Sequence, residues 1–256
     1  MKIAIACPSY GRPDRLETPN VLPDIRVFVD STETQKYQER NPNAKLEICP
    51  DGIQGNICRV RNYILDSLLP MYDAVLIVDD DFQGLFIWEG KKSNKIEGKE
   101  FYCFVEKYSL VAKELKVGMW GVNVNTDAQC YRERTPFSFL SYVGSPFGVF
   151  LHGCSLRYDE RFSLKEDYDM TLQQIKMYRK ILRVNKAYYS VRQVEQRGGC
   201  STYRSVQNEK NQLKLLQKKW GSEIVKTSDR SHIAKTRKHD KVIQINPILH
   251  VPISGV

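Results

Sequence analysis

The sequence contains no long hydrophobic run. Its 256 residues are 41% hydrophobic and 11% aromatic, but no apolar stretch approaches the roughly 20 residues that span a bilayer. Met1 and Lys2 lead directly into an apolar segment that is too short for a signal peptide. We therefore expect a globular cytoplasmic protein that does not engage a membrane, formed by one large domain or two small ones.

The seven cysteines lack the spacing of a metal site or of a disulfide framework. They are scattered and odd in number, and none forms a Cys-x-x-Cys pair, so we expect reduced thiols. Internal repeats, low-complexity linkers and the Lys-Ser/Thr ending of a P-loop are also missing, and we do not predict a P-loop ATPase. An acidic excess is absent as well. The net charge of +9 indicates an anionic partner, a nucleic acid or a nucleotide, although a solvated basic surface also fits.

An apolar run followed by three carboxylates organises the rest of the chain. Residues 74–78 are typical of a parallel strand buried on both faces, and Asp79, Asp80 and Asp81 follow. Three carboxylates at such a place repel one another, so a divalent cation is expected to compensate them. Asp79 and Asp81 point the same way on an extended backbone, with Asp80 opposed. Mg²⁺ or Mn²⁺ held there would complete its shell with substrate phosphates. A solvated acidic turn is the alternative.

Polar loops follow the strands predicted at residues 2–7 and 25–29. Ligands of open α/β sheets lie at the carboxyl ends of the strands. There, Tyr10 is placed to stack on a base, Arg12 to meet a phosphate, and Asp30 to accept hydrogen bonds from a ribose or a base edge. An ordinary Pro/Gly turn fits the first loop equally well.

A glycine-rich segment opens a predicted helix at residues 52–65. Its apolar residues recur at helical spacing, and Arg59 and Arg61 lie in its first turns. Free N–H groups and arginines at a helix entry suit a pyrophosphate. A second predicted helix begins with Glu166 and Asp167. Acidic residues in a first turn are ordinary helix capping, but beside the aspartate triplet they favour a general base or an acceptor-binding carboxylate.

The order of these motifs resembles the GT-A class of nucleotide-sugar glycosyltransferases. Four features match: a nucleotide loop at residues 8–12, Asp30, the strand-terminal Asp-x-Asp, and the acidic block at residues 159–169. The resemblance covers most of residues 3–185. It implies an α/β fold, with a mixed, mostly parallel sheet flanked by helices in a core of residues 1–195. The nucleotide-binding half would span about residues 1–125 and the acceptor half about residues 126–195, with a basic C-terminal segment, residues 196–256, packed on the same domain.

More narrowly, the chain resembles the TET-associated glycosyltransferases of bacteriophages. The carrying residues are 77–81, 166–169 and 198–204, the last ahead of a basic helix. The resemblance implies transfer of a sugar from a UDP-sugar to a 5-hydroxymethylpyrimidine, foremost 5-hydroxymethylcytosine, in phage DNA. The basic C-terminal half would contact the DNA. Three alternatives remain open: a glycan, lipid or protein acceptor, a nucleotidyltransferase, and a DNA-binding module without catalysis.

The resemblance also implies a role for each candidate residue. Asp167, or in its place Glu166, would take the proton of the acceptor hydroxyl. Asp79, Asp81 and a C-terminal histidine would bind Mn²⁺ or Mg²⁺. His232 is taken as that histidine, but His239 and His250 are equal candidates, because nothing in the spacing decides among the three. The sugar nucleotide would be bound by Pro8, Tyr10, Arg12, Asp30, Arg59, Arg61, Asp79 and Asp80. An acceptor base in a duplex would have to flip out to reach them.

Overall fold

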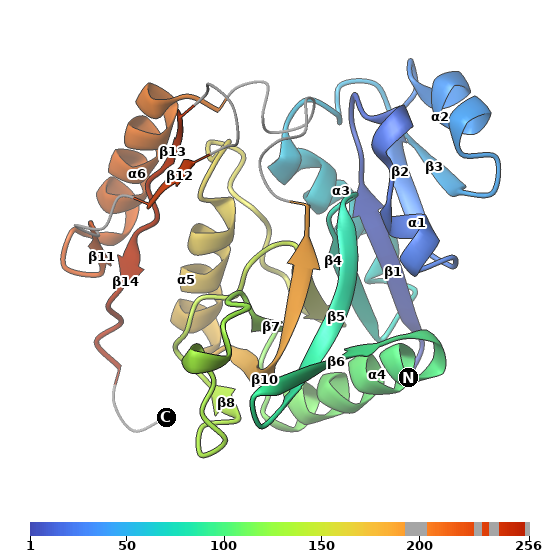
Figure 1. The fold of residues 1–256 in the computed structure, drawn as a ribbon. Coiled ribbons are helices and arrows are strands. Elements are labelled where there is room, and N and C mark those ends of the chain that lie inside the picture. Colours follow the sequence, from blue (N-terminus) through green and yellow to red (C-terminus); the bar gives the residue numbers. More distant parts are fainter. Residues whose placement is uncertain (193–203, 228–231, 236–240, 254–256) are drawn as a thin grey trace.

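The computed structural model describes residues 1–192, 204–227, 232–235 and 241–253, without the side chains of residues 130, 232–235 and 241–244. Its centre is a sheet of ten strands flanked by helices (Figure 1). The strands lie in the order β3 (Lys45–Cys49), β2 (Arg26–Asp30), β1 (Ile3–Pro8), β4 (Ala74–Val78), β9 (Phe147–Leu151), β7 (Met119–Asn123), β10 (Leu182–Val191), β5 (Phe82–Glu89) and β6 (Lys92–Ile96), and β8 (Phe137–Ser138) pairs with β10.

The strand directions bring the predicted ligand loops to one edge of the sheet. Strands β3, β2, β1 and β4 are mutually parallel, β9 is antiparallel to both β4 and β7, and β10 is parallel to β7. The carboxyl ends of β1, β2 and β4 therefore lie together. The predicted α/β architecture, a mixed and mostly parallel sheet flanked by helices, is confirmed.

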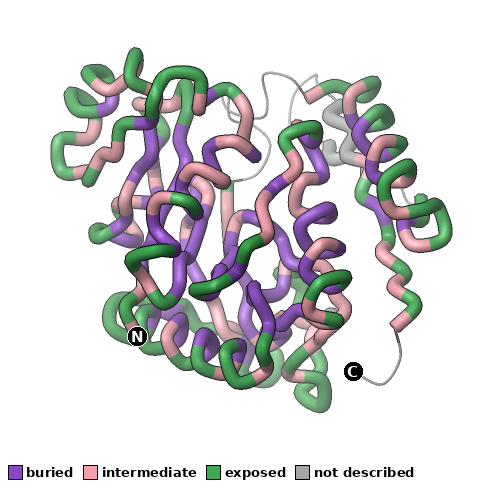
Figure 2. Tube along the Cα trace, turned by 180° about the vertical axis from the view of Figure 1, so that it is seen from behind, coloured by how far each residue is buried: buried purple, intermediate pink, exposed green. Residues whose placement is uncertain are grey.

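Helices cover both faces of the sheet. They are α1 (Thr18–Val21), α2 (Thr34–Arg40), α3 (Ile57–Leu68), α4 (Gly98–Glu114), α5 (Glu166–Tyr178) and α6 (Val206–Trp220), with short 3₁₀ turns at Pro13–Arg15 and Ala128–Cys130. One apolar cluster joins the sheet to α4, and a second joins it to α3, α5 and α6. Figure 2 shows the resulting buried layer of strands. The all-apolar sequence of β4 follows from this burial on two sides.

The C-terminal part lies beside α5 (Figure 1). Leu213 and Leu216 of α6 are buried in the same apolar cluster as Leu172 and Ile175 of α5. Beyond α6, β11 (Val225–Lys226) pairs with β14 (Ile248–Leu249), and β12 (His232–Lys235) pairs with β13 (Lys241–Gln244). The boundary predicted between residues 195 and 196 lies outside the described residues. In the part of the chain described here, no helix combines the length and the apolar character that crossing a membrane requires.

Two segments form other strands than their sequence indicates, and one further strand was not predicted. The segments 181–184 and 187–191 each indicate a separate strand in the sequence, but Leu182–Val191 form the single strand β10, whose pairing with β7 shifts register after Val184. The charged segment 91–99 contains β6, an edge strand, and such strands carry lysines without an apolar face. Residues 244–251, whose sequence indicates one final strand, do not form one: Gln244 ends β13, only Ile248–Leu249 form β14, and the two strands pair with different partners.

Candidate active site

The aspartate triplet begins where β4 ends, and its first two carboxylates face different cations. Asp79 Oδ1 accepts a hydrogen bond from Arg61 Nη2 at 2.9 Å. Asp80, only 4% exposed, accepts from Arg12 Nη1 at 2.8 Å and from Ser9 Oγ at 2.7 Å. Asp80 therefore ties the end of β4 to the loop after β1. Arg12, predicted to meet a phosphate, is already engaged with this carboxylate.

Backbone contacts with α1 fix the turn that carries the triplet. The Thr18 hydroxyl donates to the Asp79 carbonyl at 2.7 Å and accepts from the Phe82 amide at 3.0 Å. The amides of Glu17 and Thr18 donate to the Asp80 carbonyl at 3.0 and 3.2 Å. Buried backbone groups are thereby satisfied, and the carboxylates project from a rigid turn.

Burial and the neighbouring carboxylates oppose full ionisation of the triplet. Burial, followed by the charges of Asp79 and Asp80, raises the pKa of Asp81 to about 8. Burial also raises the pKa of Asp80, against the opposing effect of Arg12. Within the described ranges, no three His, Cys, Asp or Glu side chains converge to hold a metal by themselves. This donor set fits a hard cation that binds through one or two carboxylates and takes its remaining ligands from water and substrate phosphates.

Arg61 joins the aspartate triplet to the start of α5. Its Nη1 donates to Glu166 Oε1 at 2.8 Å, while its Nη2 holds Asp79. The Arg61 side chain is 3% exposed, and its guanidinium lies 5.5 Å from the centre of the Tyr158 ring. Burial and then the charge of Asp167 raise the pKa of Glu166 to about 7, whereas Arg61 lowers it. The two acidic motifs, far apart in sequence, thus meet on one buried arginine.

Asp167 is held by its neighbours through both carboxylate oxygens. Oδ2 accepts a hydrogen bond from the Tyr142 hydroxyl, and Oδ1 accepts from the Tyr168 amide at 2.9 Å. The Tyr142 ring stacks on that of Tyr168, with the centroids 4.1 Å apart. Burial, followed by the charge of Asp167, raises the pKa of Tyr142 well above its ordinary value. Tyr142 is therefore a protonated donor that fixes the orientation of Asp167, a contact that the sequence did not indicate.

The remaining candidates on the nucleotide side differ in exposure. Pro8 ends β1 and is buried, whereas Tyr10 is 41% exposed. Asp30 Oδ1, at the end of β2, accepts from the Thr32 amide and hydroxyl at 2.9 and 2.6 Å. Arg59 forms an ion pair with Glu160 at 3.2 Å, in which both side chains are exposed. Tyr10 and Arg59 are accordingly accessible to a ligand.

The predicted metal ligand His232 and the predicted loop at residues 198–204 are described only in part. His232 begins β12 opposite Gln244, and its side chain is not described. Residues 198–203 lie outside the described residues. The metal role of His232 and the ligand role of this loop remain predictions.

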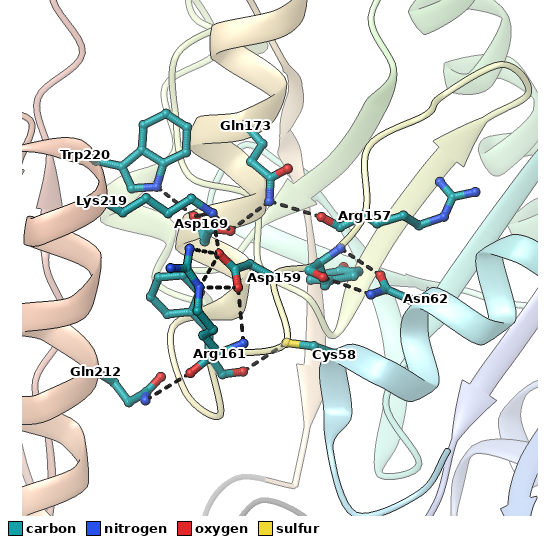
Figure 3. Close-up of polar contacts among 12 residues, drawn as sticks. Cys58, Asn62, Arg157, Asp159, Arg161, Asp169, Gln173, Gln212, Lys219 and Trp220 are labelled. Carbon is teal, nitrogen blue, oxygen red and sulfur yellow. Dashed lines mark hydrogen bonds and ion pairs between the residues drawn. The ribbon is translucent and has the colours of Figure 1, made fainter. Parts of the chain in front are cut away.

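Asp169, part of the predicted acidic block, contacts α6 (Figure 3). It is completely buried and accepts hydrogen bonds from Trp220 Nε1 at 2.7 Å, Lys219 Nζ at 2.9 Å and Gln173 Nε2 at 2.7 Å. These contacts satisfy the buried charge. Asp169 therefore fastens α6 to α5.

Comparisons with solved structures find distant similarities. A197 from STIV is 14% identical, with a TM-score of 0.42, covering 77% of this chain and 89% of that one. The 4-diphosphocytidyl-2C-methyl-D-erythritol synthase from Anaerococcus prevotii is 11% identical, with a TM-score of 0.40, covering 77% and 91%. A putative nucleotide-diphospho-sugar transferase from Desulfovibrio desulfuricans is 13% identical, with a TM-score of 0.37, covering 72% and 80%. These values are too low to bear on the substrate.

A comparison with protein families gives a specific match. No curated protein matches the chain, but the model of the TET-Associated Glycosyltransferase family matches residues 3–199. That range contains the aspartate triplet after β4, the start of α5 and the arginine that joins them. The chain therefore belongs to the family of TET-associated glycosyltransferases, and it is a glycosyltransferase.

Proposed function

We propose that the enzyme transfers a sugar from a UDP-sugar to the hydroxymethyl group of a 5-hydroxymethylpyrimidine, foremost 5-hydroxymethylcytosine, in phage DNA. The observation that carries this proposal is the bridge of Arg61 between Asp79 and Glu166. It brings the carboxylates suited to a nucleotide-bound cation next to the carboxylates suited to an acceptor hydroxyl. Transfer between two bound substrates requires such proximity.

On the donor side, the exposed ring of Tyr10 and the carboxylate of Asp30 are assigned to the nucleoside. Arg59, the accessible arginine of α3, is assigned to the diphosphate. Asp79 and Asp81 would hold Mn²⁺ or Mg²⁺, which supplies charge neutralisation for the leaving nucleoside diphosphate.

On the acceptor side, Asp167 is assigned as the base that takes the proton of the hydroxymethyl group if the enzyme inverts. The Tyr142 hydroxyl donates to one carboxylate oxygen of Asp167 and the Tyr168 amide donates to the other, and these two hydrogen bonds hold the base in place. A general base must lie within hydrogen-bond reach of the proton that it removes. A base in duplex DNA therefore has to be extruded from the duplex to come within reach of Asp167.

The outer face of α6 supports a DNA acceptor. It carries lysines at every fourth position, about 6 Å apart along the helix, and all are exposed: Lys210, Lys214 and Lys218. The opposite face of α6 is buried through Leu213 and Leu216. Exposed lysines in a row neutralise DNA phosphates without reading sequence, and their contribution falls with salt.

The test is nucleoside-diphosphate release from a panel of UDP-sugars, with Mn²⁺ or EDTA. Duplex DNA containing 5-hydroxymethylcytosine is compared with the same duplex containing cytosine. Metal-dependent UDP release that requires the modified duplex is the expected result. Release that is indifferent to the DNA would refute the acceptor. Pyrophosphate release from a nucleoside triphosphate would replace the proposal with nucleotidyl transfer.

A further inference from the structure

Helix α6 holds the segment that leads into α5. The amides of Ser163 and Leu164 donate to Gln212 Oε1 at 3.0 and 3.4 Å. Gln212 Nε2 in turn donates to the Arg161 carbonyl at 3.4 Å (Figure 3). Asn208 Nδ2 donates to the Ser163 hydroxyl at 3.2 Å. Residues 161–164 form no helix or strand, so these bonds supply partners that regular structure would otherwise provide.

A buried ion pair continues this contact to Lys165, the residue that caps the N-terminus of α5. Lys165 Nζ lies 2.6 Å from Glu209 Oε2, and their side chains are 6% and 0% exposed. Lys165 caps α5 in a left-handed conformation, with φ of 73°, which is unfavourable for a residue with a side chain and persists only where the surroundings impose it. Its carbonyl accepts from the Asp169 amide at 3.1 Å. The ion pair therefore holds the turn from which Glu166 and Asp167 project.

A second contact holds α5 one turn later. Lys219 of α6 pairs with Asp169 and also with Asp159, at 2.8 Å in each case. Trp220 donates to the same Asp169 carboxylate. The start of α5 is thus fastened to α6 at Lys165 and again at Asp169.

We infer that Glu209 is a positioning residue for sugar transfer, acting through Lys165 on the orientation of Glu166 and Asp167. The family match ends at residue 199, so this residue belongs to a helix beyond the matched region. The inference rests on the proposed role of Asp167 as the acceptor-side base. Glu209 would act at a distance from the substrates, by setting the orientation of Asp167 toward the acceptor hydroxyl. Small displacements of a reacting group lower the rate steeply.

The test is Glu209→Gln, with two independent readouts. Amide hydrogen exchange of the peptide spanning residues 161–169 is expected to become about tenfold faster, while the peptides of β1 and β4 keep their rates. The kcat for transfer is expected to fall about tenfold or more, while the KM for the donor stays within about twofold. Leu216→Ala is the matched control on the same helix. It removes buried apolar volume from α6 but leaves the ion pair between Lys165 and Glu209 in place, so it is expected to lower the Tm while the kcat stays within about twofold.

If Glu209→Gln does not fold, the pair is replaced by Lys165→Met with Glu209→Leu. Apolar side chains of similar volume keep a buried site stable but do not fix a left-handed turn, so faster exchange and a lower kcat are still expected. Two results would overturn the inference. One is a folded variant in which the peptide 161–169 exchanges at the wild-type rate. The other is a variant in which the KM for the donor rises by the same factor as the kcat falls. Absence of transfer by the wild type would refute the proposed function alone, because the exchange measurement needs no substrate.

Discussion

Replacing Arg61 with Met removes the cation between two carboxylates and should lower stability in a pH-dependent way. The substitution keeps most of the side-chain length and the apolar contacts, but both hydrogen bonds, at 2.8 and 2.9 Å, are lost. Removing one member of a buried ion pair costs about 3–5 kcal/mol. The Asp79 side chain is 31% exposed, whereas that of Glu166 is 12% exposed. Because solvent screens Asp79, we expect the lower end of that range, about 3 kcal/mol of unfolding free energy at pH 8.

The pH dependence follows from the pKa of Glu166, which burial raises from 4.5 to about 7. A carboxyl with a raised pKa contributes stability that is fully present below its unfolded pKa and is lost as the pH rises through its folded pKa. Arg61 lowers the pKa of Glu166. Without Arg61 the pKa is therefore higher, and stability continues to fall with rising pH over a wider range. At pH 5 Glu166 is protonated with or without Arg61, and the deficit of the variant should shrink to about 1–2 kcal/mol.

The assay is urea unfolding of the wild type and of Arg61→Met at pH 5 and pH 8. Arg59→Met is the matched control, because Arg59 lies on the same helix and its ion pair with Glu160 is exposed. We expect this control to lose less than about 1 kcal/mol at either pH. A deficit for Arg61→Met that is equal at the two pH values, or no larger than that of the control, would refute the bridging role.

Three further outcomes are expected. Tyr142→Phe deletes one hydrogen bond to the proposed base and should lower the kcat about tenfold with an unchanged donor KM; steady-state kinetics that show a change in KM alone would contradict this. Asp79→Asn should abolish metal-dependent sugar transfer while circular dichroism shows a folded protein, and full activity would remove the metal assignment. Replacing the lysines of α6 with Gln should reduce the slope of log K for DNA against log salt by about three, whereas the same number of replacements in β6 and its turn should not. The first set is Lys210, Lys214 and Lys218, and the control set is Lys91, Lys92 and Lys95.

Helical spacing in the sequence distinguishes the two arginines of α3, although the pyrophosphate hypothesis treated them alike. Arg61 lies four residues after Ile57 and four before Leu65, on the face that carries the buried residues Ile64 and Leu65. Arg59 does not share that face. A charged residue at an apolar position of a helix has to find a buried partner, so the spacing signals an internal ion pair for Arg61. Glu209 shows the same signal on α6, four residues before Leu213.

The partners of these buried charges could not be predicted. Arg61 and Glu166 are 105 residues apart in the sequence, and Ser9 and Asp80 are 71 apart. The periodicity of a segment reports which face is buried, but it contains nothing about the element that covers that face. The strand ending in the aspartate triplet was predictable because burial on both faces leaves a purely apolar run. The register shift in β10 was not, because it depends on pairing with β7.

The internal ion pairs also bear on how the donor diphosphate is neutralised. The net charge of +9 suggests abundant cations for an anionic ligand, yet Arg12 and Arg61 are engaged with Asp80, Asp79 and Glu166. Their charges stabilise carboxylates before any substrate binds. Burial, followed by the charges of Asp79 and Asp80, raises the pKa of Asp81, so a diphosphate entering beside Asp79 approaches a cluster that already resists further negative charge. A divalent cation that binds carboxylate and phosphate together would remove both repulsions, so the internal pairing of these arginines favours metal dependence more strongly than the Asp-x-Asp spacing does.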